Sequence, residues 1–150
     1  ETLQSTLRGA MAALGPGGLD GPRRPRVVLT TTPTEQHGLG LLMAECFFAL
    51  ESCERLALGV STPVADIVLA ARQLSVDVLA LSFSVHASRR DVLDALEQLV
   101  AHVPEGVEVW AGGAGVARLR RGVPEGVSVL RRASDVTARI AQWRQRHRPA

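Results

Sequence analysis

Short apolar runs alternate along the chain with longer segments in which apolar residues recur every three or four positions. The β-branched run at residues 26–31 predicts a strand, and the apolar spacing over residues 39–52 predicts the helix that follows it. The same alternation continues and predicts strands at residues 55–60, 77–83, 107–111 and 127–130, and helices at residues 64–74, 92–103, 116–121 and 134–146.

Strands that alternate with helices favour a parallel sheet with right-handed crossovers and helices on both faces. The segment at residues 77–83 is apolar almost throughout, as expected of a central strand that is covered on both faces. We therefore predict an α/β fold, a doubly wound, flavodoxin-like (Rossmann) sheet of five parallel strands in the order 2-1-3-4-5. In that order a ligand is expected at the carboxyl ends of the strands, at the switch point between the first and third strands.

The start of the chain has a different pattern. Apolar residues at helical steps over residues 1–14 predict the end of an upstream helix. Residues 15–25 are dense in Gly and Pro, which predicts a linker. The compact domain is then expected over residues 26–147, and the chain is expected to be a fragment of a longer protein.

The formal net charge is +2, and basic and acidic residues are interspersed until a basic cluster at residues 144–148. A cationic end of a last helix commonly complements the helix dipole. Basic residues interleaved with aromatic ones, as nucleic-acid surfaces require, are not found elsewhere in the sequence. We therefore expect any DNA contact to be made by another domain.

Cys46 and Cys53 lie seven positions apart on the same predicted helix, so their side chains share a face two turns apart and cannot bridge each other. We expect both to be small buried apolar residues in a reducing compartment. The sequence has neither an apolar run long enough to span a bilayer nor a secretory leader. A cytoplasmic location is expected.

The loop at residues 32–40 joins the first strand to the first helix and contains His37, with Glu35 two residues before it and Gly38 and Gly40 after it. A carboxylate at this spacing can hydrogen-bond one imidazole nitrogen and fix the tautomer, which is how proteins prepare a metal ligand. Polar or small residues also follow other strands, namely Ser82, Ser84 and His86 after the third and Gly112 and Gly113 after the fourth. All are expected at one edge of the sheet.

Several functions of this architecture are excluded by residue type. The ends of the first and third strands lack the carboxylate cluster of a phosphoacceptor domain, and no glycine-rich phosphate or dinucleotide loop follows the first strand. A Gly-x-Ser-x-Gly nucleophile turn is also absent from the sequence. From residue type alone, a loop histidine is more often a hydrogen-bonding residue than a ligand, and serines at strand ends can satisfy backbone groups.

Four spaced motifs resemble the cobalamin-binding domain of methionine synthase and its relatives. They are Glu35-x-His37-x-x-Gly40, the Leu-Gly-Val-Ser-Thr-Pro run at residues 58–63, Leu-Ser-Phe-Ser-Val at residues 81–85 and Gly-Gly-Ala-Gly at residues 112–115, within residues 26–146. The resemblance implies that His37 replaces the dimethylbenzimidazole base as lower axial ligand of cobalt, that Glu35 is its hydrogen-bonding partner, and that the displaced tail enters a slot in the sheet. The implied cofactor-binding residues are Glu35, His37, Gly38, Gly40, Thr62, Ser82, Ser84, His86, Gly112, Gly113 and Ala133, with His37 as the metal ligand.

Two positions depart from the enzymes of this family, which usually have Asp in place of Glu35 and Leu in place of Ser84. The longer carboxylate is similar to that of cobalamin-dependent, light-sensing MerR-type repressors of the CarH type. This resemblance implies a non-enzymatic, photoreceptive transcription-regulator module that binds adenosylcobalamin or methylcobalamin, with an upstream helical cap, an upstream DNA-binding domain and a possible homo-oligomer. The alternatives are a corrinoid carrier domain of a methyltransferase or mutase, and a degenerate interaction module that no longer binds cobalamin.

Overall fold

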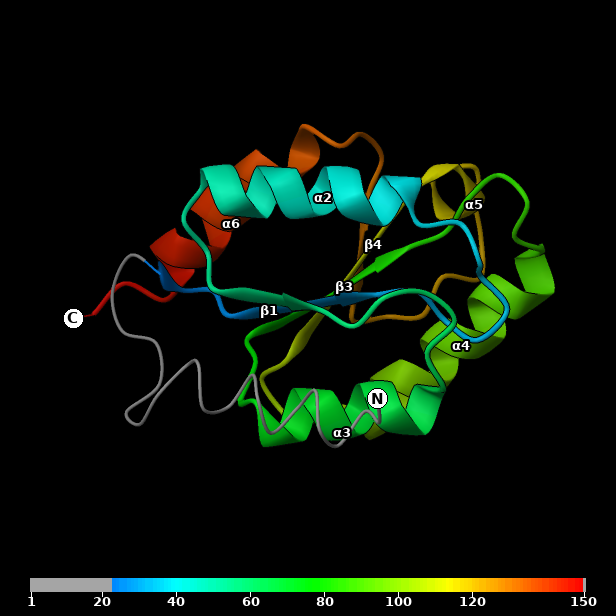
Figure 1. The fold of residues 1–150 in the computed structure, drawn as a ribbon, viewed down its shortest axis with the longest axis horizontal. Coiled ribbons are helices and arrows are strands. Elements are labelled where there is room, and N and C mark those ends of the chain that lie inside the picture. Colours follow the sequence, from blue (N-terminus) through cyan, green and yellow to red (C-terminus); the bar gives the residue numbers. More distant parts are fainter. Residues whose placement is uncertain (1–22, 150) are drawn as a thin grey trace.

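The fold is described by a computed structural model for residues 23–149 (Figure 1). The predicted upstream helix at residues 1–14 and most of the predicted linker lie outside the described residues. The elements in chain order are β1 (Val27–Thr30), α2 (Leu39–Leu50), β2 (Arg55–Ala57), α3 (Val64–Gln73), β3 (Val78–Ser82), α4 (Arg89–His102), β4 (Glu108–Gly112), α5 (Ala114–Ala117), β5 (Val127–Leu130) and α6 (Asp135–Arg146).

The five strands form one parallel sheet in the order β2-β1-β3-β4-β5, which confirms the predicted α/β fold and strand order. α2 and α6 cover one face of the sheet, whereas α3 and α4 cover the other (Figure 1). Ser82 at the end of β3 pairs with Gly112 at the end of β4. The loops that follow these two strands therefore begin side by side.

Each face of the sheet has its own apolar core. Phe48, Trp110 and Ile140 are buried between the sheet and the layer of α2 and α6. On the other face, residues such as Ile67 and Leu96 are buried under α3 and α4. Every residue of β3 is buried, as its continuous apolar sequence predicted for a central strand.

The helix α2 forms where predicted, but many of its apolar side chains face outward. Leu41 and Phe48 are the buried residues of this helix, whereas Leu39, Leu42 and Leu50 are 71%, 58% and 76% exposed. α2 is apolar nearly all round, so periodicity alone cannot select which face is buried. Packing against the sheet makes that selection.

Both cysteines were predicted to be buried on one helix, but α2 ends at Leu50 and Cys53 lies beyond it. Cys53 is buried, and burial raises the pKa of its thiol to about 11. Cys46 is exposed, because it lies on the outward face of α2. The expectation that both are buried was therefore wrong for Cys46.

Element boundaries differ from the predictions mainly at loops. β2 ends at Ala57 and the chain turns through Gly59 and Ser61, which have φ values of +88° and +56°. α5 covers residues 114–117 rather than 116–121, and Ser88 caps α4 by accepting a hydrogen bond from the Asp91 amide.

Within residues 23–149, no helix has both the length and the apolar character needed to cross a membrane.

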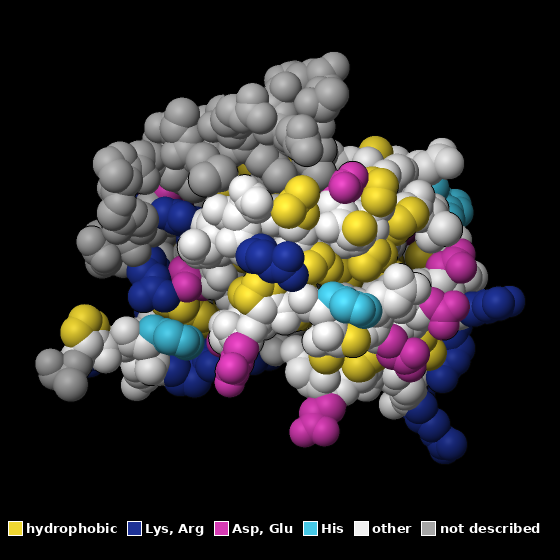
Figure 2. Space-filling view, turned by 90° about the horizontal axis from the view of Figure 1, so that it is seen from below, with side chains coloured by type: hydrophobic (Ala, Val, Ile, Leu, Met, Phe, Trp, Pro, Cys, Tyr) yellow, Lys and Arg dark blue, Asp and Glu magenta, His cyan; other side chains and the backbone are white. Residues whose placement is uncertain are grey.

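Charged side chains are dispersed over the face of the molecule that α3 and α4 cover. Figure 2 shows basic and acidic residues interspersed on this face, without a continuous basic stripe. This distribution agrees with the mixed charge pattern of the sequence.

Candidate functional site

The loop that presents His37 is closed by the side chains of Thr31 and Ser61. Both hydroxyls donate to the carbonyl of Glu35, from Thr31 Oγ1 at 2.7 Å and from Ser61 Oγ at 3.1 Å. Thr31 Oγ1 also accepts a hydrogen bond from the Ser61 amide at 2.8 Å. The end of β1 and the loop after β2 therefore hold the backbone of Glu35 in one position.

The Glu35 carboxylate is buried, at 3% exposure, and accepts four hydrogen bonds. Oε1 accepts from the Ser84 amide at 2.6 Å. Oε2 accepts from the Ser84 hydroxyl at 3.0 Å and from the His37 amide at 3.1 Å, and lies 3.0 Å from His37 Nδ1. Burial by itself would raise the pKa of Glu35, but the hydrogen bonds from Ser84 and His37 outweigh it and lower the pKa. Glu35 is thus an ionised anchor for the imidazole.

An ionised carboxylate can only accept hydrogen bonds, so in the pair with Glu35 the Nδ1 atom of His37 must be the donor and carry a proton. Nε2 is left without a proton in the neutral ring, and none of the described residues hydrogen-bonds to it. The His37 side chain is 56% exposed. A neutral imidazole with a bonded Nδ1 and an accessible Nε2 is the usual state of a histidine that is ready to bind a metal.

Ser84 and His86 complete this cluster. The Ser84 hydroxyl accepts a hydrogen bond from the His86 amide at 3.2 Å and lies 3.4 Å from His37 Nδ1. The His86 ring stacks on that of His37, with centroids 4.6 Å apart and an interplanar angle of 25°. The structure therefore brings together four of the predicted residues, which come from the loops after β1 and β3.

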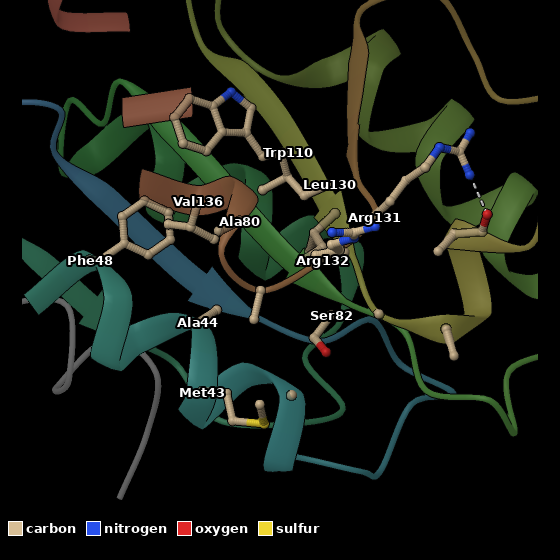
Figure 3. A pocket seen from close by; sticks show the side chains of 17 residues that line it. Met43, Ala44, Phe48, Ala80, Ser82, Trp110, Leu130, Arg131, Arg132 and Val136 are labelled. Carbon is tan, nitrogen blue, oxygen red and sulfur yellow. Dashed lines mark hydrogen bonds between the residues drawn. The ribbon is translucent and has the colours of Figure 1, made fainter. Parts of the chain in front are cut away.

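An apolar pocket of about 430 Å³ opens on the α2 and α6 face of the sheet (Figure 3). Its lining includes five predicted residues, namely Gly40, Ser82, Gly112, Gly113 and Ala133. We expected a ligand at the switch point between the first and third strands, whereas this pocket lies over β3, β4 and β5. The cause is that β1 is covered by α2, while small residues such as Ala80 and Gly112 leave the hollow.

The glycines at this edge have different roles. A Cβ on Gly40 would lie 2.6 Å from Ser82 Oγ, so a side chain at residue 40 would require the Ser82 hydroxyl to move. Gly113 has a φ of +97°, and a Cβ would lie 2.2 Å from the Phe83 carbonyl oxygen. Gly113 is thus required by the chain itself, whereas Gly112 has only ordinary contacts and borders the pocket.

Two predicted residues lie away from the pocket. The Thr62 hydroxyl is 2.7 Å from Thr30 Oγ1, so it links the loop before α3 to the end of β1. A Cβ on Gly38 would lie 3.1 Å from Val60 Cγ1, so Gly38 lets the His37 loop pack against the loop after β2.

Residues 23–149 contain no group of three or more His, Cys, Asp or Glu that could enclose a metal ion. His37 could therefore be only a single protein ligand to a metal held by other atoms.

Sequence reasoning missed part of the pocket lining. Phe48 and Trp110 form its inner wall, and Arg131 and Arg132 stand at its edge directly after β5. The arginines could have been found by applying to the fifth strand the strand-end rule that was used for the first, third and fourth. The aromatic residues gave no such signal, because nothing in their spacing separates a pocket wall from a core.

Comparison with known proteins gives one curated relative and several solved structures. The chain is 34% identical over 102 residues to the HTH-type transcriptional repressor CarH of Myxococcus xanthus, an alignment that covers 68% of this chain and 34% of the relative. The chain thus spans about a third of that relative's length. No family model matches the sequence.

Three similar solved structures share the fold. A cobalamin-binding protein from Desulfitobacterium hafniense has a TM-score of 0.67 and 19% identity, over 81% of this chain and 60% of the other. The monomethylamine corrinoid protein of Methanosarcina barkeri has a TM-score of 0.63 and 15% identity, over 81% and 59%. The methanol:cobalamin methyltransferase complex MtaBC of the same organism has a TM-score of 0.67 and 11% identity, over 90% and 55%.

The identities to the solved structures are low, so these structures establish the fold, and the relation to CarH rests on the sequence match. Both agree with the resemblance that the four sequence motifs indicated. The chain is a domain with the fold of cobalamin-binding proteins, related in sequence to CarH.

Proposed function

We propose that this chain is a cobalamin-binding module in which His37 Nε2 is the lower axial ligand of cobalt. The observation that supports this most is the His37–Glu35 pair beside an apolar pocket at the same edge of the sheet. Ionised Glu35 holds Nδ1 and leaves Nε2 accessible. The pocket would hold the dimethylbenzimidazole tail.

The donor set and the shape of the site fit this cofactor. A corrin ring supplies four equatorial nitrogens, so one imidazole from the protein suffices as the lower ligand. Three apolar side chains are exposed at this edge: Leu39 at the start of α2 (71%), Val60 in the loop after β2 (42%) and Val85 in the loop after β3 (58%). Such exposed apolar side chains are suited to cover by the flat, largely apolar face of a macrocycle.

Each part of the chain has a distinct role in this proposal. Glu35 and Ser84 orient His37, His86 supports its ring by stacking, and Ser82, Gly112 and Ala133 border the space for the tail. Bound cobalamin supplies a cobalt–carbon bond that light or a chemical reaction can break, in its adenosyl or methyl form. The residues themselves bind, orient and shield the cofactor.

The test is a spectroscopic titration of the chain with methylcobalamin or adenosylcobalamin. The wild-type chain should convert the spectrum to that of a histidine-ligated, base-off form. His37→Ala should lose this conversion and bind at least about tenfold more weakly, because it removes a direct metal ligand. The matched control is His102→Ala, since His102 is exposed on α4 and bonds only the Gln98 carbonyl of its own helix.

Equal spectra and affinities for the wild type and His37→Ala would refute axial ligation by this residue. A full-length protein, with the segments upstream of this chain, that binds neither cobalamin would instead support the degenerate interaction module. Circular dichroism of each variant verifies that loss of binding is not loss of fold.

We further propose that the module belongs to a transcriptional regulator and senses cobalamin or light, because the curated relative is a transcriptional repressor. In this arrangement an upstream helix, to which residues 1–14 belong, covers the upper face of the corrin. DNA is contacted by an upstream domain, and cofactor binding or photolysis changes oligomerisation. Gel filtration of the full-length protein with adenosylcobalamin, in the dark and after illumination, tests the sensory role.

The second candidate is a corrinoid carrier domain that serves a methyltransferase or mutase. It is favoured by the structural similarity to the monomethylamine corrinoid protein and to MtaBC. The sequence upstream of Glu1 separates the two candidates. A helix-turn-helix domain supports the regulator, and a catalytic barrel or a partner methyltransferase supports the carrier.

A further inference from the structure

We propose that Arg132 is an anion anchor for the phosphate of the cofactor's nucleotide tail, an inference that rests on the proposed function. The pocket is apolar in its interior, with Phe48, Trp110 and Val136 in its wall, but two cationic residues border it. Such a site is complementary to a ligand with a flat apolar end and a negatively charged connecting group. The tail of cobalamin has this composition, since a phosphodiester joins the benzimidazole nucleotide to the corrin side chain.

Hydrogen bonding distinguishes Arg132 from Arg89, Arg118 and Arg131, which lie near the same edge. Arg118 donates to the carbonyls of Val85 and Ala87, and Arg89 donates to the carbonyl of Arg121. Arg131 donates to the carbonyl of Ala117, and Figure 3 shows its side chain extending away from the pocket. These three guanidinium groups therefore already donate hydrogen bonds to backbone carbonyls of the protein.

Arg132 has no such partner within the described residues. Its guanidinium takes part in no hydrogen bond or ion pair there, although the side chain borders the pocket. The neighbouring carboxylate of Asp135 is occupied by the amides of Arg131 and Arg132, at 3.1 Å and 3.0 Å. The loop is therefore held by its backbone, which leaves the Arg132 fork available for a ligand.

The position of Arg132 also suits the path of the tail. It follows β5 directly, so it stands at the carboxyl edge of the sheet, where His37 also lies. A tail that enters the pocket from this edge must pass its rim, and only its base reaches the apolar wall. A planar guanidinium can hold two phosphate oxygens at once, whereas a lysine offers a single point charge.

The experiment compares three corrinoids that differ only in the tail: methylcobalamin, methylcobinamide phosphate and methylcobinamide, which lacks the phosphate. Dissociation constants are measured by spectral titration for the wild type, Arg132→Gln, Arg132→Lys and a control, Arg72→Gln. Arg72 is exposed at the end of α3, on the opposite face and edge of the sheet. The Arg72→Gln substitution therefore removes the same charge far from the pocket.

Arg132→Gln should weaken methylcobalamin and methylcobinamide phosphate by about tenfold and leave methylcobinamide unchanged, as expected for one lost charge-assisted contact. Arg132→Lys should recover part of the loss, and Arg72→Gln should match the wild type. Equal affinities of Arg132→Gln and wild type for methylcobalamin would overturn the inference while the proposed function stands. A loss of the same size with methylcobinamide would also overturn it. A full-length wild-type protein that binds none of the three would overturn both proposals.

Discussion

Gly113→Ala is expected to destabilise the protein strongly, because two costs coincide at this residue. Gly113 has φ and ψ of +97° and +162°, a backbone region that is essentially restricted to glycine. An added Cβ would lie 2.2 Å from the carbonyl oxygen of Phe83, and backbone atoms cannot rotate away as a side chain can. The conformational cost is about 1–3 kcal/mol and the overpacking adds about 1–3 kcal/mol, so the free energy of unfolding should fall by about 2–6 kcal/mol.

Gly106→Ala is the matched control. Gly106 has a φ of +90°, but no atom lies within 4 Å of the place where its Cβ would be. This variant has the conformational cost of about 1–2 kcal/mol without the clash. For a domain of this size, a difference of about 2 kcal/mol between the two variants corresponds to about 4–8 °C in Tm.

Urea unfolding followed by the fluorescence of Trp110 and Trp143 measures both variants. If Gly113→Ala proved as stable as Gly106→Ala, the close approach between Gly113 and Phe83 would not exist as described. Gly112→Ala is a third variant, because its Cβ would lie 3.5 Å from the Leu130 carbonyl oxygen, an ordinary contact. It should keep wild-type stability and lower cobalamin affinity, since Gly112 borders the pocket.

Two further predictions concern packing and pH. Phe48→Ala should lower the free energy of unfolding in urea by about 3–5 kcal/mol, because Phe48 is 1% exposed. Leu50→Ala on the same helix should change it by less than about 0.5 kcal/mol, because Leu50 is 76% exposed. Comparable losses for the two variants would contradict the assigned face of α2. The folded-state pKa of Glu35 is lower than its ordinary value of 4.5, so the stability it contributes is full above that pH and is lost as the pH falls through the folded-state pKa. The wild type should therefore exceed Glu35→Gln in stability near neutral pH and lose that advantage in acid, and a constant difference across pH would show that the carboxylate charge does not matter.

The order of elements and the parallel sheet follow from the sequence alone. Periodicity and β-branched runs are local properties, and the crossover rule limits alternating strands and helices to a few topologies, of which the observed strand order is one. The same rule places the ends of β1, β3 and β4 at one edge. For this reason Glu35, His37, Ser84 and His86 could be expected near one another before any coordinates were known.

The tertiary structure decided which face of α2 is buried, where the pocket lies and which arginine is free to bind. α2 is apolar on most sides, so only its packing against the sheet shows that Phe48 is inside and Leu50 outside. The pocket depends on small residues at the ends of β3 and β4 that meet beneath two helices. The Arg132 guanidinium is available because it has no partner among the described residues, whereas the neighbouring Arg131 donates to the Ala117 carbonyl. These properties arise from contacts between residues far apart in the chain, and no local pattern encodes them.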